Sequence, residues 1–221
     1  MTSAVAISLG VLSVVALLLG ALILGRYGRE RRLWNLYWGT GIVLVFVTLV
    51  EESALDAGMW SQLLIRSYLV ITAVLVGVLS LGSAELALSR RWKYLWFGFI
   101  GVVSAACVAV GALTPVPSSI MFDGAVWSLP PTIVVVASSL VTVPGAAMLI
   151  GTSLYGVVRQ RRFYLLYVTL GTIVFALGGS LYIASFPAAM YFADFAGTVL
   201  LFFGFVRVTD RSAAAVRTAT A

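Results

Sequence analysis

Carboxylates gather in one short stretch of a chain that has few of them. Glu51, Glu52 and Asp56 are three of only eight acidic residues, and Arg66 follows them closely in the sequence. Clustered carboxylates beside an arginine could bind a cation, pass a proton, or act as general acid and base. The rest of the sequence decides which of these chemistries it admits.

Most enzymatic chemistry is excluded by a missing residue type. The chain contains no histidine, which removes histidine-ligated haem and the triads that join histidine to serine or cysteine. An intramembrane zinc hydrolase would need several histidine or carboxylate ligands at fixed spacing. We therefore predict a non-enzymatic protein with no metal and no other cofactor, leaving open only a mechanism that uses carboxylates alone.

The amino-acid composition indicates that membrane-spanning helices position these side chains. The chain is 62% apolar and only 10% charged, whereas a soluble domain has about 25% charged residues. Runs of about 20 apolar residues are long enough to cross a bilayer as helices. We predict an all-α membrane protein, a seven-transmembrane-helix bundle in one domain (1–211) with a short tail (212–221). The seven predicted helices are 5–24, 33–50, 63–88, 94–113, 132–154, 164–183 and 188–208.

The basic residues predict an orientation. Thirteen of the fourteen follow the first, third, fifth and seventh of these runs, and Arg66 is the exception. Because cytoplasmic loops retain Lys and Arg, the N-terminus is predicted outside and the C-terminus in the cytoplasm of a cell membrane. The predicted partner of the protein is therefore the lipid bilayer. No nucleic-acid partner is predicted despite the net charge of +6. The oligomeric state does not follow from the sequence.

A shift of 130 positions aligns residues 31–37 with 161–167 and Gly41 with Gly171. This register predicts a parallel repeat of residues 1–88 and 130–208 around a linker helix, 94–113, as in some transporters. The alternative is a chance match, because every turn on that side is basic.

This order of three, one and three helices resembles SWEET-type sugar transporters and microbial rhodopsins. On Trp60, Arg66 and Tyr68 the chain also resembles prokaryotic seven-helix proteins of unassigned role. The resemblance implies a transporter-like or opsin-like protein, with two departures. A rhodopsin binds retinal through a lysine in its last helix, whereas the only lysine here, Lys93, lies outside that helix. SWEET-type proteins have hinge prolines in both repeats, whereas Pro144 is the only proline so placed here.

The charges of the outer half would face one another inside such a bundle. Asp194 lies roughly 10 Å along the last predicted helix at 1.5 Å per residue. Because an unpaired carboxylate in a membrane costs a few kcal/mol, we expect Asp194 to pair with Arg66, either as a structural ion pair or within a functional site. The predicted outward-facing polar pocket is lined by Glu51, Glu52, Arg66, Tyr68, Tyr182, Tyr191 and Asp194.

The excess negative charge of this pocket favours a small cationic or polar ligand. A protein that binds or transports such a solute is the first functional prediction. The alternatives are a chromophore-less opsin-like sensor that needs a separate effector, and a structural or assembly subunit of a membrane complex. Small residues on facing helix stripes, such as Gly77 and Ser80, are expected to serve helix packing. Glu85 is expected to pair with Arg90, Arg91 or a neighbouring loop.

Overall fold

Helices make up almost all of the described chain. The computed structural model describes residues 3–118, 121–122, 125–126, 130–183, 193 and 195–207. The helices are α1 (Ser3–Glu30), α2 (Leu33–Asp56), α3 (Gln62–Ala87), α4 (Arg90–Leu113), α5 (Thr132–Gln160), the short 3-10 helix η2 (Phe163–Leu165), α6 (Leu166–Ile183) and a last helix, Phe195–Arg207. Two short strands, β1 (Met121–Phe122) and β2 (Ala125–Val126), pair antiparallel between α4 and α5. The all-α prediction is confirmed for the described residues, apart from this small ladder.

Five of the seven predicted crossings have the length and composition of membrane spans. The spans are Leu9–Glu30, Leu33–Leu55, Gln62–Ala87, Arg90–Leu113 and Thr132–Arg159. The remaining two helices contribute shorter apolar stretches, Phe163–Phe175 and Phe195–Arg207. The described chain is thus a multi-pass membrane protein with five candidate spans and two shorter apolar helices.

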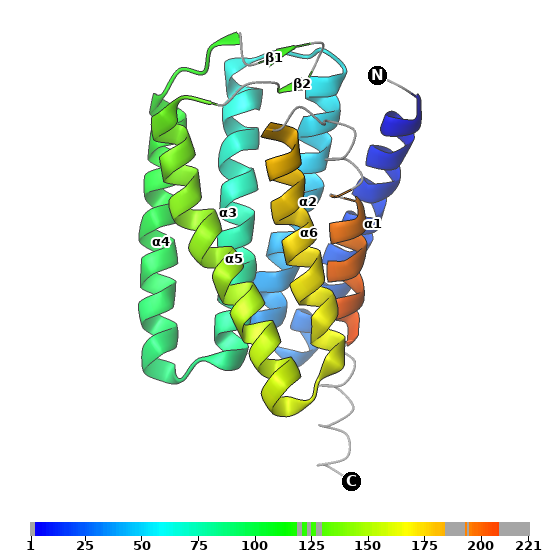
Figure 1. The fold of residues 1–221 in the computed structure, drawn as a ribbon, viewed down its shortest axis with the longest axis vertical. Helices are drawn as coiled ribbons and strands as arrows, with labels where there is room; N and C mark the ends of the chain where they lie inside the picture. Colours follow the sequence, from blue (N-terminus) through cyan, green and yellow to red (C-terminus); the bar gives the residue numbers. More distant parts are fainter. Residues whose placement is uncertain are drawn as a thin grey trace.

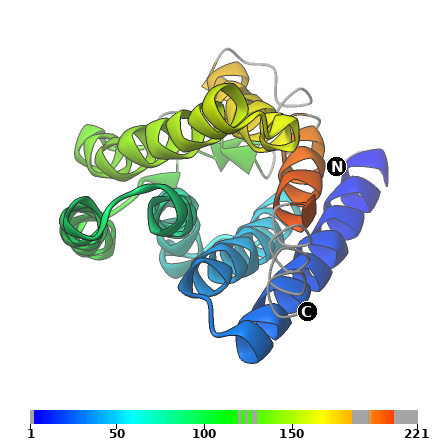
Figure 2. The ribbon, with the colours of Figure 1, turned by 90° about the horizontal axis from the view of Figure 1, so that it is seen from below.

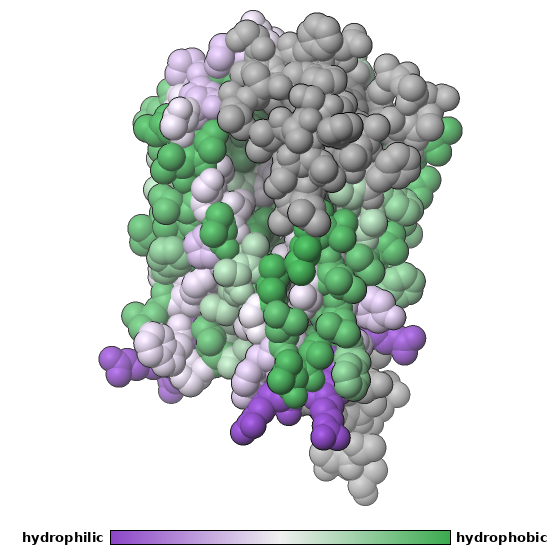
Figure 3. Space-filling view, viewed as in Figure 1, coloured by the Kyte–Doolittle hydropathy of each residue, from purple (hydrophilic) through white to green (hydrophobic). Residues whose placement is uncertain are grey.

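The helices stand side by side and alternate in direction (Figure 1). The turns at 31–32, 88–89 and 161–162 all lie at the lower end in that view, and the α2–α3 turn and the β1–β2 ladder lie at the upper end. Hydrophilic residues gather at the lower end of the surface in Figure 3, below a largely apolar belt. We call the lower end the basic end and the upper end the far end.

Helix α3 organises the packing because it contacts α2, α4 and α5. Its small residues Ala73, Gly77, Ser80 and Ala84 are all buried, so this stripe serves helix packing as predicted. A Cβ on Gly82 would overlap the indole of Trp38 on α2, and that indole packs against Phe205 of the last helix at a centroid distance of 4.5 Å. The main core therefore joins α3, α2 and the last helix through close contacts.

Helix α4 is peripheral (Figure 2). It packs on α3 and α5 through a cluster of small residues, Ala73, Cys107, Ala137 and Val141. Helix α5 continues through Pro144 as one helix and runs obliquely, so that it lies near α4 at the far end and diverges from it toward the basic end (Figures 1 and 2). The divergence leaves room between these helices in the basic half.

Candidate functional site

The α2–α3 turn fixes the far-end side chains relative to one another. Gly58 has a φ of +79°, which a residue with a Cβ adopts only with strain, and its N–H donates to Leu55 O at 2.9 Å. Ser61 then caps α3 by accepting a hydrogen bond from the N–H of Leu64 at 3.0 Å. The end of α2 is tight and α3 begins with a cap directly after it. The position of Glu51 relative to the first turns of α3 is therefore fixed.

Glu51 and Glu52 lie within the last turns of α2. Glu52 is buried at 8% exposure, while Glu51 is half-buried and lies beside Ser67 of α3. The Oε2 atom of Glu51 is buried and has no hydrogen-bond partner among the described residues. A buried acceptor without a donor is uncommon in proteins, so this oxygen calls for a partner beyond the described contacts.

A groove of about 400 Å³ lies beside these residues, between the end of α2 and the start of α3. Ser67, the neighbour of Glu51, lines it, and so does the indole of Trp60, which is 37% exposed. Its other lining residues are Ala54, Met59, Ser61, Leu63 and Leu64. The groove therefore combines an aromatic face with a nearby carboxylate.

Arg66 faces a different helix. Its Nη1 donates a hydrogen bond to the carbonyl oxygen of Ala112, in the last turn of α4, at 2.9 Å. The carbonyls that end a helix carry partial negative charge and lack intrahelical partners, so a guanidinium stabilises them. The Nε of Arg66 is buried without a hydrogen-bond partner among the described residues, which leaves one donor for a further acceptor.

Gln62 reinforces the same contact one turn earlier. Its Nε2 donates to Val116 O at 2.6 Å, and its Oε1 accepts from Val116 N at 3.2 Å. Val116 is buried in a small cluster with Leu55 and Ile65, against which Tyr68 packs. Gln62 and Arg66 thus hold the end of α4 and the residues after it against α3.

The other predicted pocket residues are not placed by the described part of the chain. Tyr191 and Asp194 lie outside the described residues, and so does the side chain of Tyr182, whose backbone belongs to α6. The pairing of Arg66 with Asp194 stays a prediction. Sequence reasoning missed the contacts of Arg66 with the end of α4 and of Gln62 with Val116 beyond it, because they involve backbone groups, which every residue carries.

Arg90, Arg91 or a neighbouring loop was expected to pair with Glu85, and the partner is Lys93 at 2.8 Å, from the same basic cluster. The lysine lies two turns beyond Glu85 in sequence and reaches back from the first turns of α4. Within the described residues no group of three or more acidic, cysteine or histidine side chains could hold a metal ion.

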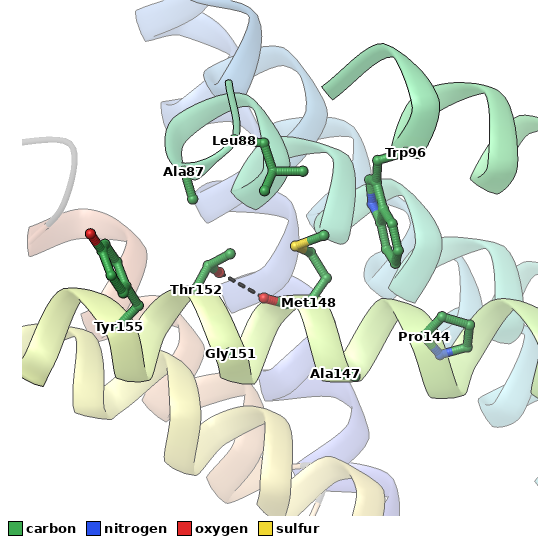
Figure 4. A pocket seen from close by; sticks show the side chains of 9 residues that line it. All are labelled: Ala87, Leu88, Trp96, Pro144, Ala147, Met148, Gly151, Thr152 and Tyr155. Carbon is green, nitrogen blue, oxygen red and sulfur yellow. Dashed lines mark hydrogen bonds between the residues drawn. The ribbon is translucent and has the colours of Figure 1, made fainter. Parts of the chain in front are cut away.

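A second and larger groove lies in the basic half, where α5 diverges from α4 (Figure 4). It has a volume of about 510 Å³ and is lined by Ala87, Leu88, Trp96, Pro144, Ala147, Met148, Gly151, Thr152 and Tyr155. The side chains of Leu88 and Trp96 face those of Met148 and Thr152 across it (Figure 4). Sequence reasoning did not predict this groove, and its only sign was a proline inside a long apolar run.

Comparisons with known proteins do not extend the description. A scan against protein-family models and searches of the curated proteins and of the solved structures found no match for this chain. The resemblance to SWEET-type transporters and microbial rhodopsins thus has support only at the level of an all-helical membrane architecture. That architecture, with its five candidate spans, is what the structure establishes about the chain's class.

Proposed function

We propose that the chain crosses the membrane seven times with its far end outside, and that it binds or transports a small organic cation at that end. The basic turns at the opposite end support this orientation, since cytoplasmic loops retain Lys and Arg. Helix α6 and the last helix would be the two further crossings. The proposal involves no enzymatic step.

The unpartnered Oε2 of Glu51 is the observation that carries the ligand class. Glu51 does not line the groove itself, but it lies beside Ser67, which lines the groove together with the exposed Trp60. A cation placed over an indole face and near a carboxylate gains from both the ring quadrupole and the charge. An anion would meet the negative charge of Glu51 and Glu52, so the groove favours cations.

The predicted repeat lends this function some further support. Gly41 and Gly171, which the shift of 130 positions aligns, each lie against a leucine of the helix that follows. A Cβ on Gly41 would come within 2.5 Å of Leu79, and one on Gly171 within 2.9 Å of Leu201. Equivalent helices of the two halves therefore make the same kind of close contact, as the two repeats of a transporter would.

The test is thermal stabilisation of the purified full chain by organic cations such as choline and tetramethylammonium. A ligand at 100 times its Kd stabilises by about 2.7 kcal/mol, which for a chain of this size is a Tm rise of roughly 5–10 °C. Glu51→Gln should abolish this rise, whereas Glu30→Gln, at the basic end, should retain it. Uptake of the same cation into liposomes then separates transport from binding alone.

The proposal is wrong if no organic cation raises the Tm, or if Glu51→Gln and Glu30→Gln respond alike. A structural role is the second candidate, and the hydrogen bonds that Gln62 and Arg66 make to backbone of α4 and beyond favour it. In that case the far-end polar residues would affect stability without any ligand dependence.

A further inference from the structure

The groove of the basic half opens sideways, and the polar groups in its deeper part are already bonded within the protein. Thr152 Oγ1 donates to Met148 O at 2.7 Å, and Trp96 Nε1 donates to Ser80 Oγ at 3.2 Å. The polar atoms of these two lining side chains are therefore already bonded within the protein. What remains toward the groove is hydrocarbon, sulfur and indole ring, which suits an acyl chain, and the phenol of Tyr155 lies toward its basic end.

The basic end of the groove has the opposite character. Leu88, in its wall, immediately precedes the start of α4, where Arg90, Arg91 and Lys93 occupy the first turns. On α5, Met148, Thr152, Tyr155 and Arg159 follow one another at helical spacing on one face, which places Arg159 beyond the groove's end. Because α5 diverges from α4, the arginines of the two helices flank the basic end of the groove from opposite sides.

The charges at this end favour an anion. The N-terminus of a helix carries partial positive charge, and α4 adds three basic residues to it with no side-chain cap from Ser89. Glu85 is taken by Lys93 at 2.8 Å, and Glu30 lies 3.6 Å from Arg32. In the described part of the chain, neither of these carboxylates is left to offset Arg90, Arg91 or Arg159.

We propose that this groove is a binding site for an anionic phospholipid of the leaflet at the basic end. One acyl chain lies along α5 between Trp96 and Gly151, and the phosphate lies at the basic end of the groove, which Arg90 and Arg91 flank from α4 and Arg159 from α5. Basic pockets between helices on the cytoplasmic side bind anionic head groups by this combination of charge and apolar depth. The site is independent of the solute groove at the far end.

Gly151 offers a direct way to fill the groove. A Cβ on this residue meets nothing within 4 Å, so Gly151→Leu has open space at its first side-chain carbon and fills part of the groove. Gly98 on α4 is the matched control, since it is equally exposed and open but does not line the groove. The purified full chain is titrated in detergent with phosphatidylglycerol or phosphatidylcholine of identical acyl chains, and bound lipid is counted by native mass spectrometry.

We expect phosphatidylglycerol to bind wild type and Gly98→Leu equally, and Gly151→Leu at least tenfold more weakly. Should Gly151→Leu fail to fold, Ala147→Leu in the same wall gives the same comparison. Equal retention by the variants of Gly151 and Gly98, whether high or low, would overturn the site.

The head-group part of the site is tested separately. Arg90→Gln, Arg91→Gln and Arg159→Gln should each reduce the preference for phosphatidylglycerol over phosphatidylcholine by about fivefold, since one basic residue near an anionic head group contributes about that factor. Arg29→Gln, on α1 at the same end, should leave the preference unchanged. A preference that survives removal of all three groove arginines, or that Arg29→Gln reduces equally, contradicts the proposal.

Discussion

At the scale of single residues, the far end shows polar side chains that serve backbone groups of a neighbouring segment. Gln62 and Arg66 lie one turn apart on α3, and both reach the end of α4 or the residues just after it. In a bilayer a helix-terminal carbonyl cannot form a hydrogen bond with water. Such contacts therefore contribute more to stability there than at the surface of a soluble protein. The pair therefore fixes the one helix that has few other buried contacts.

Arg66→Ala should lower the free energy of unfolding by about 1–2 kcal/mol, because it removes a charge-assisted hydrogen bond to a helix C-terminus. The measurement is unfolding by SDS titration, with Arg29→Ala, an exposed arginine at the basic end, as the control that should change little. If Arg66 chiefly serves Asp194, Asp194→Asn would cost the same amount and the double variant no more. Additive losses would instead assign Arg66 to α4.

The candidate site shows how far single residues can be read from a sequence. The scarcity of charge drew attention to Glu51, Glu52 and Arg66, and the structure places all three at the far end. The partners were not predictable in the same way, because helix rotation decides them. Arg66 faces α4 while Glu51 lies beside Ser67, and a rotation of about 100° per residue separates such neighbours.

At the scale of elements, the close approach of α2 and α3 depends on glycine. Trp38 is buried between Trp34, at a centroid distance of 5.4 Å, and Phe205, at 4.5 Å, so its indole cannot move aside. The Cδ1 edge of the indole occupies the space that a side chain on Gly82 would need. Small residues allow such close helix packing in membranes.

Gly82→Ala should therefore destabilise the protein by about 1–3 kcal/mol through overpacking, although alanine is the better helix former. Gly98→Ala, where nothing lies within 4 Å of the new Cβ, should be neutral or stabilise by up to about 1 kcal/mol. The two variants thus differ in sign, and SDS unfolding or Tm measures both. Equal effects would show that the α2–α3 contact is looser than described.

Helix boundaries were predicted less well than helices, for one physical reason. The apolar windows ended at residues 24, 50 and 154, while α1, α2 and α5 continue to Glu30, Asp56 and Gln160. Arg, Glu and Gln are good helix formers, so a helix continues beyond the hydrocarbon region that defines the window. As a consequence Glu51 and Glu52 belong to α2 and are held by it, and do not lie in a loop after it.

At the scale of the whole molecule, the structure separates two chemically different ends. The described basic residues other than Arg66 lie at or near the turns of the basic end, and the groove beside α4 and α5 opens near that end. The sequence predicted this separation because charge clusters alternate with apolar runs. It could not predict the groove, since the crossing angle of α5 depends on packing between residues far apart in the chain.

The orientation of these two ends can be measured with single cysteines. Cys107 is buried, so Cys107→Ala gives a background without cysteine, in which Ser61→Cys marks the far end and Ser89→Cys the basic end. Both serines are exposed, so either thiol would be open to reagent. A membrane-impermeant maleimide added to intact cells should label the variant at 61 at once and the variant at 89 only after permeabilisation, because arginine-rich turns stay in the cytoplasm. The reverse labelling pattern would mean that the protein has the opposite orientation. The groove near Glu51 would then face the cytoplasm and bind an intracellular solute, and the lipid site would lie in the outer leaflet.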